Sequence, residues 1–70
     1  MNSLDERCRQ AFKGSRKLQP NTPNAEQLAN IEMRLKQIFT EQELEQLDDK
    51  SLIRQVERVW PIARYVDQLA

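Results

Sequence analysis

Hydrophobic residues recur at steps of three and four along most of the chain, and this spacing places them on one face of an α-helix. The clearest run lies in residues 23–39, where Leu28, Ile31, Leu35 and Ile38 form a stripe of the kind that joins paired helices. The stripe covers fewer than three heptads, which is too short to indicate a coiled coil. It predicts a helix whose apolar face needs a partner helix, within this chain or in another one.

The N-terminal segment predicts a first helix over residues 3–17. Ser3 followed by Glu6 has the spacing of a capping box, in which the serine hydroxyl and the glutamate carboxylate each accept a hydrogen bond from the backbone. Gly14 is the expected weak point, where the helix can end early. The positions that share the apolar face are Leu4, Cys8, Ala11, Phe12, Ser15 and Leu18.

Residues 19–24, with the sequence QPNTPN, interrupt the helical pattern and predict a linker, because proline and asparagine are typical of loops. The start of the second helix has two candidate caps. Thr22 can cap it with Pro23 at the first helical position. Asn24 with Gln27 is the alternative cap.

Two helix-start signals lie eight residues apart, at Thr40 and Asp48. Thr40 forms a capping box with Glu43, and both caps have apolar residues on either side that can pack as a hydrophobic staple. A staple fixes the angle at which the chain enters a helix. The two signals therefore predict a short corner helix over residues 41–47, followed at once by a longer one.

Apolar positions continue in helical phase from Leu52 to Leu69 and predict a final helix over residues 49–69. Pro61 interrupts this helix, where it removes one backbone hydrogen bond and its ring clashes with an earlier carbonyl, at a cost of about 3 kcal/mol in a helix interior. Because the apolar phase continues across the proline, we expect a kink at Pro61. A separate terminal helix over residues 61–69 is the alternative.

The composition favours the same fold class. One glycine in 70 residues argues against a β protein rich in turns, and a chain of this length has room for a single domain, residues 1–70. We therefore predict an all-α protein, a small bundle of three to four helices with a short corner helix and a proline-kinked C-terminal helix. A core this small is marginal, so oligomerisation or unusually good helix packing is expected.

Charge is unevenly distributed although the net charge is zero. Residues 1–24 carry five basic and two acidic side chains, residues 25–49 carry two basic and seven acidic ones, and residues 50–70 carry four basic and two acidic ones. This alternation permits self-association between oppositely charged segments. It is weaker support for nucleic-acid binding, which usually needs a clearly basic domain.

The residue types present in the chain argue against catalysis and metal binding. The chain has no histidine, and its one cysteine, Cys8, falls on the predicted apolar face, where a structural role is favoured. The acidic residues around 41–48 lack a glycine-containing calcium loop and are expected to be solvated. We therefore expect no enzyme, no cofactor, no metal and no small-molecule substrate. The lone cysteine and the absence of a signal-peptide pattern favour the cytoplasm, and no apolar run is long enough for a membrane span.

Protein binding is the favoured function: an adaptor or regulator that acts through an apolar helical face, with a homodimer as the expected assembly. Trp60 and Tyr65 flank the proline, and aromatic residues and arginine are enriched where interfaces bind most strongly. Trp60 could equally close a small core. The expected interface residues are Leu28, Ile31, Leu35, Ile38, Arg58, Val59, Trp60, Arg64 and Tyr65.

A small nucleic-acid-binding regulator is the alternative. The predicted short helix, turn and longer helix have the outline of a helix-turn-helix, and two basic stripes could neutralise phosphates. The first of these helices is very acidic, however, and the turn lacks glycine. The residues expected to contact nucleic acid under this alternative are Arg9, Lys13, Arg16, Lys50, Arg54 and Arg58.

Overall fold

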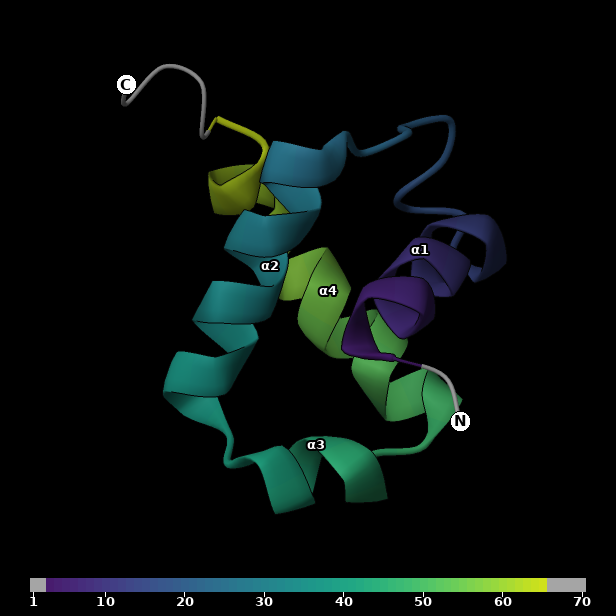
Figure 1. The fold of residues 1–70 in the computed structure, drawn as a ribbon. Helices are drawn as coiled ribbons and strands as arrows, with labels where there is room; N and C mark the ends of the chain where they lie inside the picture. The colour runs from purple at the N-terminus through teal and green to yellow at the C-terminus, as the bar shows by residue number, and fades with distance from the viewer. Residues whose placement is uncertain (1–2, 66–70) are drawn as a thin grey trace.

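The computed structural model describes residues 3–65, and four helices make up most of this range (Figure 1). In chain order the helices are α1 (Leu4–Gly14), α2 (Ala25–Ile38), α3 (Glu41–Gln46) and α4 (Asp49–Ala63). No strand occurs in this part of the chain. The predicted all-α bundle with a short corner helix is therefore confirmed.

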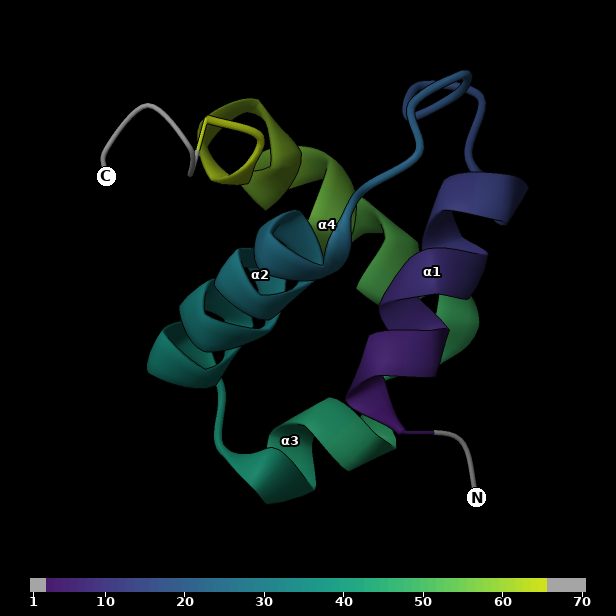
Figure 2. The same ribbon diagram turned by 45° about the horizontal axis from the view of Figure 1, so that its top comes forward.

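α1, α2 and α4 pack against one another in pairs and form the body of the bundle. α3 packs against α2 and lies across one end of the bundle. The loop that joins α1 to α2 lies at the opposite end, as two views of the ribbon show (Figures 1 and 2). The short helix thus turns the chain between the ends of α2 and α4.

One hydrophobic core joins all four helices. The apolar stripe of α2 lies within it: Leu28, Ile31 and Leu35 are buried against the chain's own helices. Phe39 and Leu47, which flank α3, pack against the same core. The fully or nearly buried apolar residues are Cys8, Ala11, Phe12, Leu18, Leu28, Ile31, Leu35, Leu44, Leu52, Val56, Val59, Trp60 and Ala63.

α1 ends at Gly14, three residues earlier than its predicted end at residue 17. The next residue, Ser15, is extended, and its hydroxyl accepts a hydrogen bond from the Leu18 N–H and donates one to the Glu57 carboxylate. These contacts fix a turn that carries the Leu18 side chain into the core. The spacing of Leu18 from the other apolar residues had predicted one more turn of helix. In the structure, a non-helical turn buries the Leu18 side chain instead.

α2 begins at Ala25, capped by Asn24, so the alternative cap is confirmed and the predicted start at residue 23 is wrong. The Asn24 side-chain oxygen accepts from the Gln27 N–H at 2.8 Å, and the Gln27 side-chain oxygen accepts from the Asn24 N–H at 2.9 Å. This reciprocal pair satisfies two backbone donors that a helix start otherwise leaves unpaired. Thr22 capping would satisfy only one such donor.

α4 continues through Pro61 and ends at Ala63. Helix therefore crosses the proline, as the continuous apolar phase indicated, and the alternative in which Pro61 begins a separate helix is not what the structure shows. The missing N–H of Pro61 falls in the last turn, where one lost hydrogen bond matters least. The remaining predicted helical residues, 66–69, lie outside the described range.

Side chains of α2 supply donors to the end of α4. The Asn30 Nδ2 group, although buried, donates to the Ala63 carbonyl at 3.2 Å, and Gln27 Nε2 donates to the Arg64 carbonyl at 3.0 Å. The last carbonyls of a helix have no partner within the helix itself. Two polar residues of α2 therefore hold the C-terminal end of α4 in place.

The N-terminal caps of α3 and α4 agree with the two predicted start signals. Thr40 and Glu43 form the reciprocal capping box, and Asp48 accepts from the Ser51 N–H at 2.8 Å. The hydrogen bonds from Ser51, backbone first, lower the pKa of the Asp48 carboxyl below its usual value of 3.8. A pKa lowered by folding means that this cap stabilises the fold above pH 3.8 and stops doing so as the pH falls through the folded-state pKa.

Replacing Asp48 with alanine is expected to lower the melting temperature at neutral pH by roughly 4–8 °C, because the cap is lost. The difference from the wild type should shrink as the pH is lowered below 3.8, where the native carboxyl also becomes protonated. Thermal unfolding followed by circular dichroism across this pH range measures both effects. Asp48→Asn is the matched control, since asparagine caps a helix without titrating, and a pH-independent difference for alanine would contradict the assignment.

Candidate functional site

The structure divides the nine predicted interface residues into two groups. Five of them are buried in the chain's own core: Leu28, Ile31, Leu35, Val59 and Trp60. Four remain exposed: Ile38, Arg58, Arg64 and Tyr65. The assignment of these five residues to an interface is therefore corrected. Their apolar stripes need partner helices, and other helices of the same chain provide them.

Trp60 shows why the helical stripe alone could not decide between core and interface. Its side chain is only 6% exposed, and its ring meets the Phe12 ring edge-on, with centroids 4.8 Å apart and an interplanar angle of 84°. This T-shaped geometry is a favourable arrangement of two aromatic rings. Trp60 therefore closes the core between α4 and α1, as the second of the two interpretations held.

Four large apolar side chains remain at the surface: Met33 (51% exposed), Ile38 (59%), Ile62 (57%) and Tyr65 (45%). Met33 and Ile38 belong to α2, Ile62 belongs to α4, and Tyr65 follows α4 by two residues. The Arg64 guanidinium lies 5.1 Å from the centroid of the Tyr65 ring, a cation–π contact. We refer to these four side chains as the exposed apolar set.

Sequence reasoning missed Met33 and Ile62. Met33 lies off the Leu28–Ile38 stripe, which is a sign that it faces away from the core. Ile62 is exposed although its neighbour Ala63 is buried. Ile38 shows the opposite case, since it lies on the stripe but is exposed. As the last residue of α2, it extends beyond the packed part of the helix.

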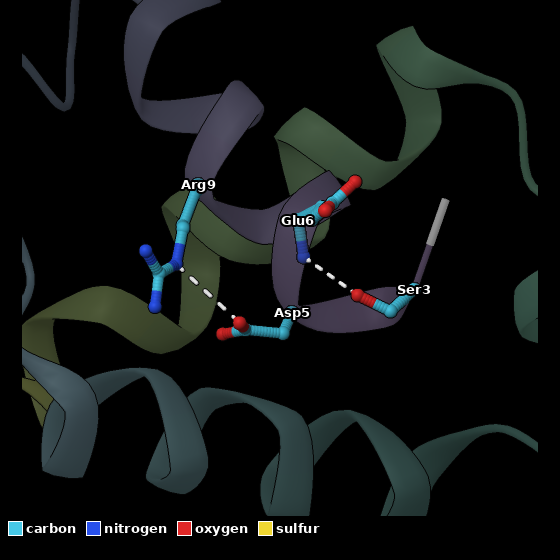
Figure 3. A network of polar contacts seen from close by, with 4 residues as sticks. All are labelled: Ser3, Asp5, Glu6 and Arg9. Carbon is cyan, nitrogen blue, oxygen red and sulfur yellow. Dashed lines mark hydrogen bonds and ion pairs between the residues drawn. The ribbon is translucent and has the colours of Figure 1, made fainter. Parts of the chain in front are cut away.

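The two basic stripes do not form one surface. Arg9, Lys13 and Arg16 are exposed on one side of α1 and the turn after it, and the α4 stripe is exposed as well. α1 and α4 pack against each other through their apolar faces, so the basic faces point away from that contact in different directions. Arg9 also pairs with Asp5, one turn earlier, at 3.4 Å (Figure 3).

Arg7 has a structural role that the sequence analysis did not assign. Its Nη1 and Nη2 atoms donate to the carbonyls of Leu44 and Leu47 at 2.8 and 2.6 Å. These carbonyls lie at the end of α3, where a positive charge is favourable. A signal was present, because Arg7 lies three residues after Leu4 and four before Ala11, on the apolar side of α1.

The α3–turn–α4 segment carries the wrong charge for a helix-turn-helix. All five acidic residues between 41 and 49 are exposed, and two of them, Asp48 and Asp49, stand at the start of α4. The start of the second helix is the part that contacts base edges in such motifs. Carboxylates at that position would repel the phosphate backbone.

A groove of about 520 Å³ lies between α1 and the α1–α2 loop. Phe12, Pro20 and Pro23 contribute apolar surface to it, and Arg9 and Lys13 contribute positive charge. Neither the helical pattern nor the linker composition predicted it, because the groove forms only when the loop folds back beside α1.

Cys8, the sole strong nucleophile candidate, is fully buried. Burial, with smaller effects from the negative charges of Glu32 and Asp5, raises the pKa of its thiol to about 12. It is therefore protonated at neutral pH, whereas the reactive form of cysteine is the thiolate. Within residues 3–65, no three side chains of the metal-ligating types come together in a group that could hold an ion.

Comparisons of the chain with protein-family models, curated proteins and solved structures gave no match. Its function is therefore inferred from its own residues. None of the helices in the described part of the chain combines the length and apolar character needed to cross a bilayer.

Proposed function

We propose that this protein is a non-catalytic protein-binding module, an adaptor or regulator that acts through the exposed apolar set on α2 and α4. The observation that carries the proposal is the exposure of Met33, Ile38, Ile62 and Tyr65 on a chain whose core is already complete without them. Single exposed apolar residues are ordinary on protein surfaces. Four large ones lie on or next to two helices that pack against each other, and we attribute their exposure to burial against a partner.

The arginines near this set fit the same role. Arg58 and Arg64 are exposed on α4 and at its end, and the Arg64 guanidinium lies over the Tyr65 ring. Arginine and tyrosine are enriched at the positions that contribute most to binding. We assign Ile62 and Tyr65 to apolar burial and the two arginines to the rim of the interface.

Nucleic-acid binding has less support as a second function. The basic stripes of α1 and α4 point in different directions, and the start of α4 is acidic. For the cellular location we propose the cytoplasm, supported by a free, buried cysteine that suits a reducing compartment.

Site-specific photocrosslinking tests the proposal. A benzophenone amino acid at position 62 should give discrete adducts with a protein when the chain is illuminated in extracts of its own cells. The same group at position 42, an exposed glutamine of α3, is the matched control. The adducts at position 62 should disappear when Tyr65 is changed to Ser and Met33 to Lys. Equal, diffuse labelling at both positions would contradict the proposal.

A further inference from the structure

The two ends of the bundle carry opposite charge. The α3 end has five exposed carboxylates between residues 41 and 49 and no basic residue in that stretch. Lys36 of α2 lies beside Glu41 and Glu45, and the Arg7 guanidinium reaches the end of α3, so these two cations offset part of the negative charge. The other end, where α1 runs into the loop, has exposed Lys13, Arg16 and Lys17 and no acidic residue in that stretch. The two views of the ribbon place α3 and the loop at opposite ends (Figures 1 and 2).

Each end also carries an apolar feature. At the basic end, the groove between α1 and the loop has an apolar lining from Phe12, Pro20 and Pro23, with Arg9 and Lys13 beside it. At the acidic end, Ile38 is the most exposed large apolar side chain of the described residues, and it stands three residues before Glu41. The acidic end thus carries an exposed apolar side chain close in sequence to the carboxylates of α3, and the basic end carries an apolar groove bordered by cations.

We infer that the groove binds the Ile38 end of a second copy of this chain, so that molecules associate head to tail. Ile38 would enter the apolar groove, and the carboxylates of α3 would lie against Lys13 and its basic neighbours. The inference rests on the proposed function, because it names a second copy as one protein partner, but it places the contact at the two ends of the bundle. Opposite charges and an apolar feature at each end are present on the same chain, and this selects a second copy as the occupant.

Head-to-tail contacts have a physical consequence that a two-fold symmetric dimer lacks. The contact uses two different surfaces, so each added molecule presents a new free end, and growth stops only if the rotation between neighbours closes a ring. Arg9 already pairs with Asp5 on its own helix, so Lys13 supplies the more available charge. Because these charges are solvent-exposed, the association should weaken as salt is added.

Light scattering on purified full-length protein tests the inference. As its concentration rises from micromolar to near-millimolar at low ionic strength, the mean molar mass of the wild type should exceed twice that of the monomer, and high salt should reverse this. Lys13→Glu removes the groove cation, and Ile38→Lys removes the apolar side chain and reverses the charge next to α3. Each variant alone should stay at the monomer mass.

Mixing the two variants gives the sharpest result. Lys13→Glu retains the Ile38 end and Ile38→Lys retains the groove, so an equimolar mixture should form dimers, twice the monomer mass, and nothing larger. Ala29→Lys is the matched control, because it also puts a lysine at an exposed apolar position of α2 but away from the acidic end, and it should associate like the wild type. Circular dichroism checks that every variant is helical; Lys13→Gln and Ile38→Gln replace any that is not.

The outcomes separate this inference from the proposed function. A wild type that stays monomeric, a mixture that shows no dimer, or a loss of association in Ala29→Lys overturns the head-to-tail contact. If discrete crosslinks from position 62 to another protein persist in any of these cases, the proposed function stands without it. If the mixture forms dimers but position 62 gives no discrete adduct, the ends of the bundle are the interaction surface and the exposed apolar set is not.

Discussion

Trp60→Ala is expected to destabilise this protein by roughly 3–5 kcal/mol, the range seen when a large buried aromatic is removed from a core. The side chain is almost fully buried and contacts Phe12 edge-on, so its loss leaves a cavity between α4 and α1. A chain of this length has a total stability of about 4–10 kcal/mol. The variant should therefore lose roughly a third or more of the total free energy of unfolding, which chemical denaturation followed by circular dichroism measures.

Trp60→Phe is the matched control for this change. The indole N–H is buried and has no hydrogen-bond partner among the described residues, so phenylalanine removes volume but no hydrogen bond. The aromatic contact with Phe12 can be retained, and the loss should be well under that for alanine. If the Trp60→Ala variant keeps its helical content and stability, Trp60 does not belong to the core, and this result would support a role in an interface.

Arg7→Met is expected to lower the free energy of unfolding by roughly 2 kcal/mol, because hydrogen bonds from a charged group contribute about 1.5–3 kcal/mol. The guanidinium donates to two carbonyls at the end of α3, and methionine keeps the apolar part of the side chain but neither donor. The variant should lose stability in α3 in addition to the decrease for the whole protein. Hydrogen exchange should show that the amides of α3 lose protection before those of α4, since α3 has few other contacts with the bundle.

Arg9→Met provides the comparison, because it removes an arginine two residues away whose ion-pair partner within residues 3–65 is Asp5, on the exposed side of α1. Exposed ion pairs of this kind contribute about 0–1 kcal/mol. The two variants make the same chemical change on one helix, so their difference isolates the contacts with α3. Equal effects on stability, or unchanged exchange in α3 of Arg7→Met, would show that Arg7 does not hold this helix.

The local features of the fold were accessible from sequence because they depend on neighbours in the chain. Helical periodicity identified α1, α2 and α4, and the paired cap signals at Thr40 and Asp48 predicted α3, the corner between α2 and α4. Caps are bonds between residues three apart, such as Thr40 and Glu43, so their spacing is visible in the sequence. One error in a helix boundary arose at the start of α2, where Thr22 and Asn24 were both possible caps. The other arose after α1, where the chain buries Leu18 through a turn and not through a longer helix.

The sequence by itself determined the fold class, the helices and the face of each helix that must be buried. The tertiary structure decided what covers each face, because the same stripe of Leu28, Ile31 and Leu35 would serve an internal core or an interface equally well. It also assigned roles to Arg7 and Asn30, whose partners lie 33 to 40 residues away, and it exposed Ile38 at the end of its own stripe. Periodicity records which side chains need burial, whereas the contacts that provide it depend on how distant segments meet in space.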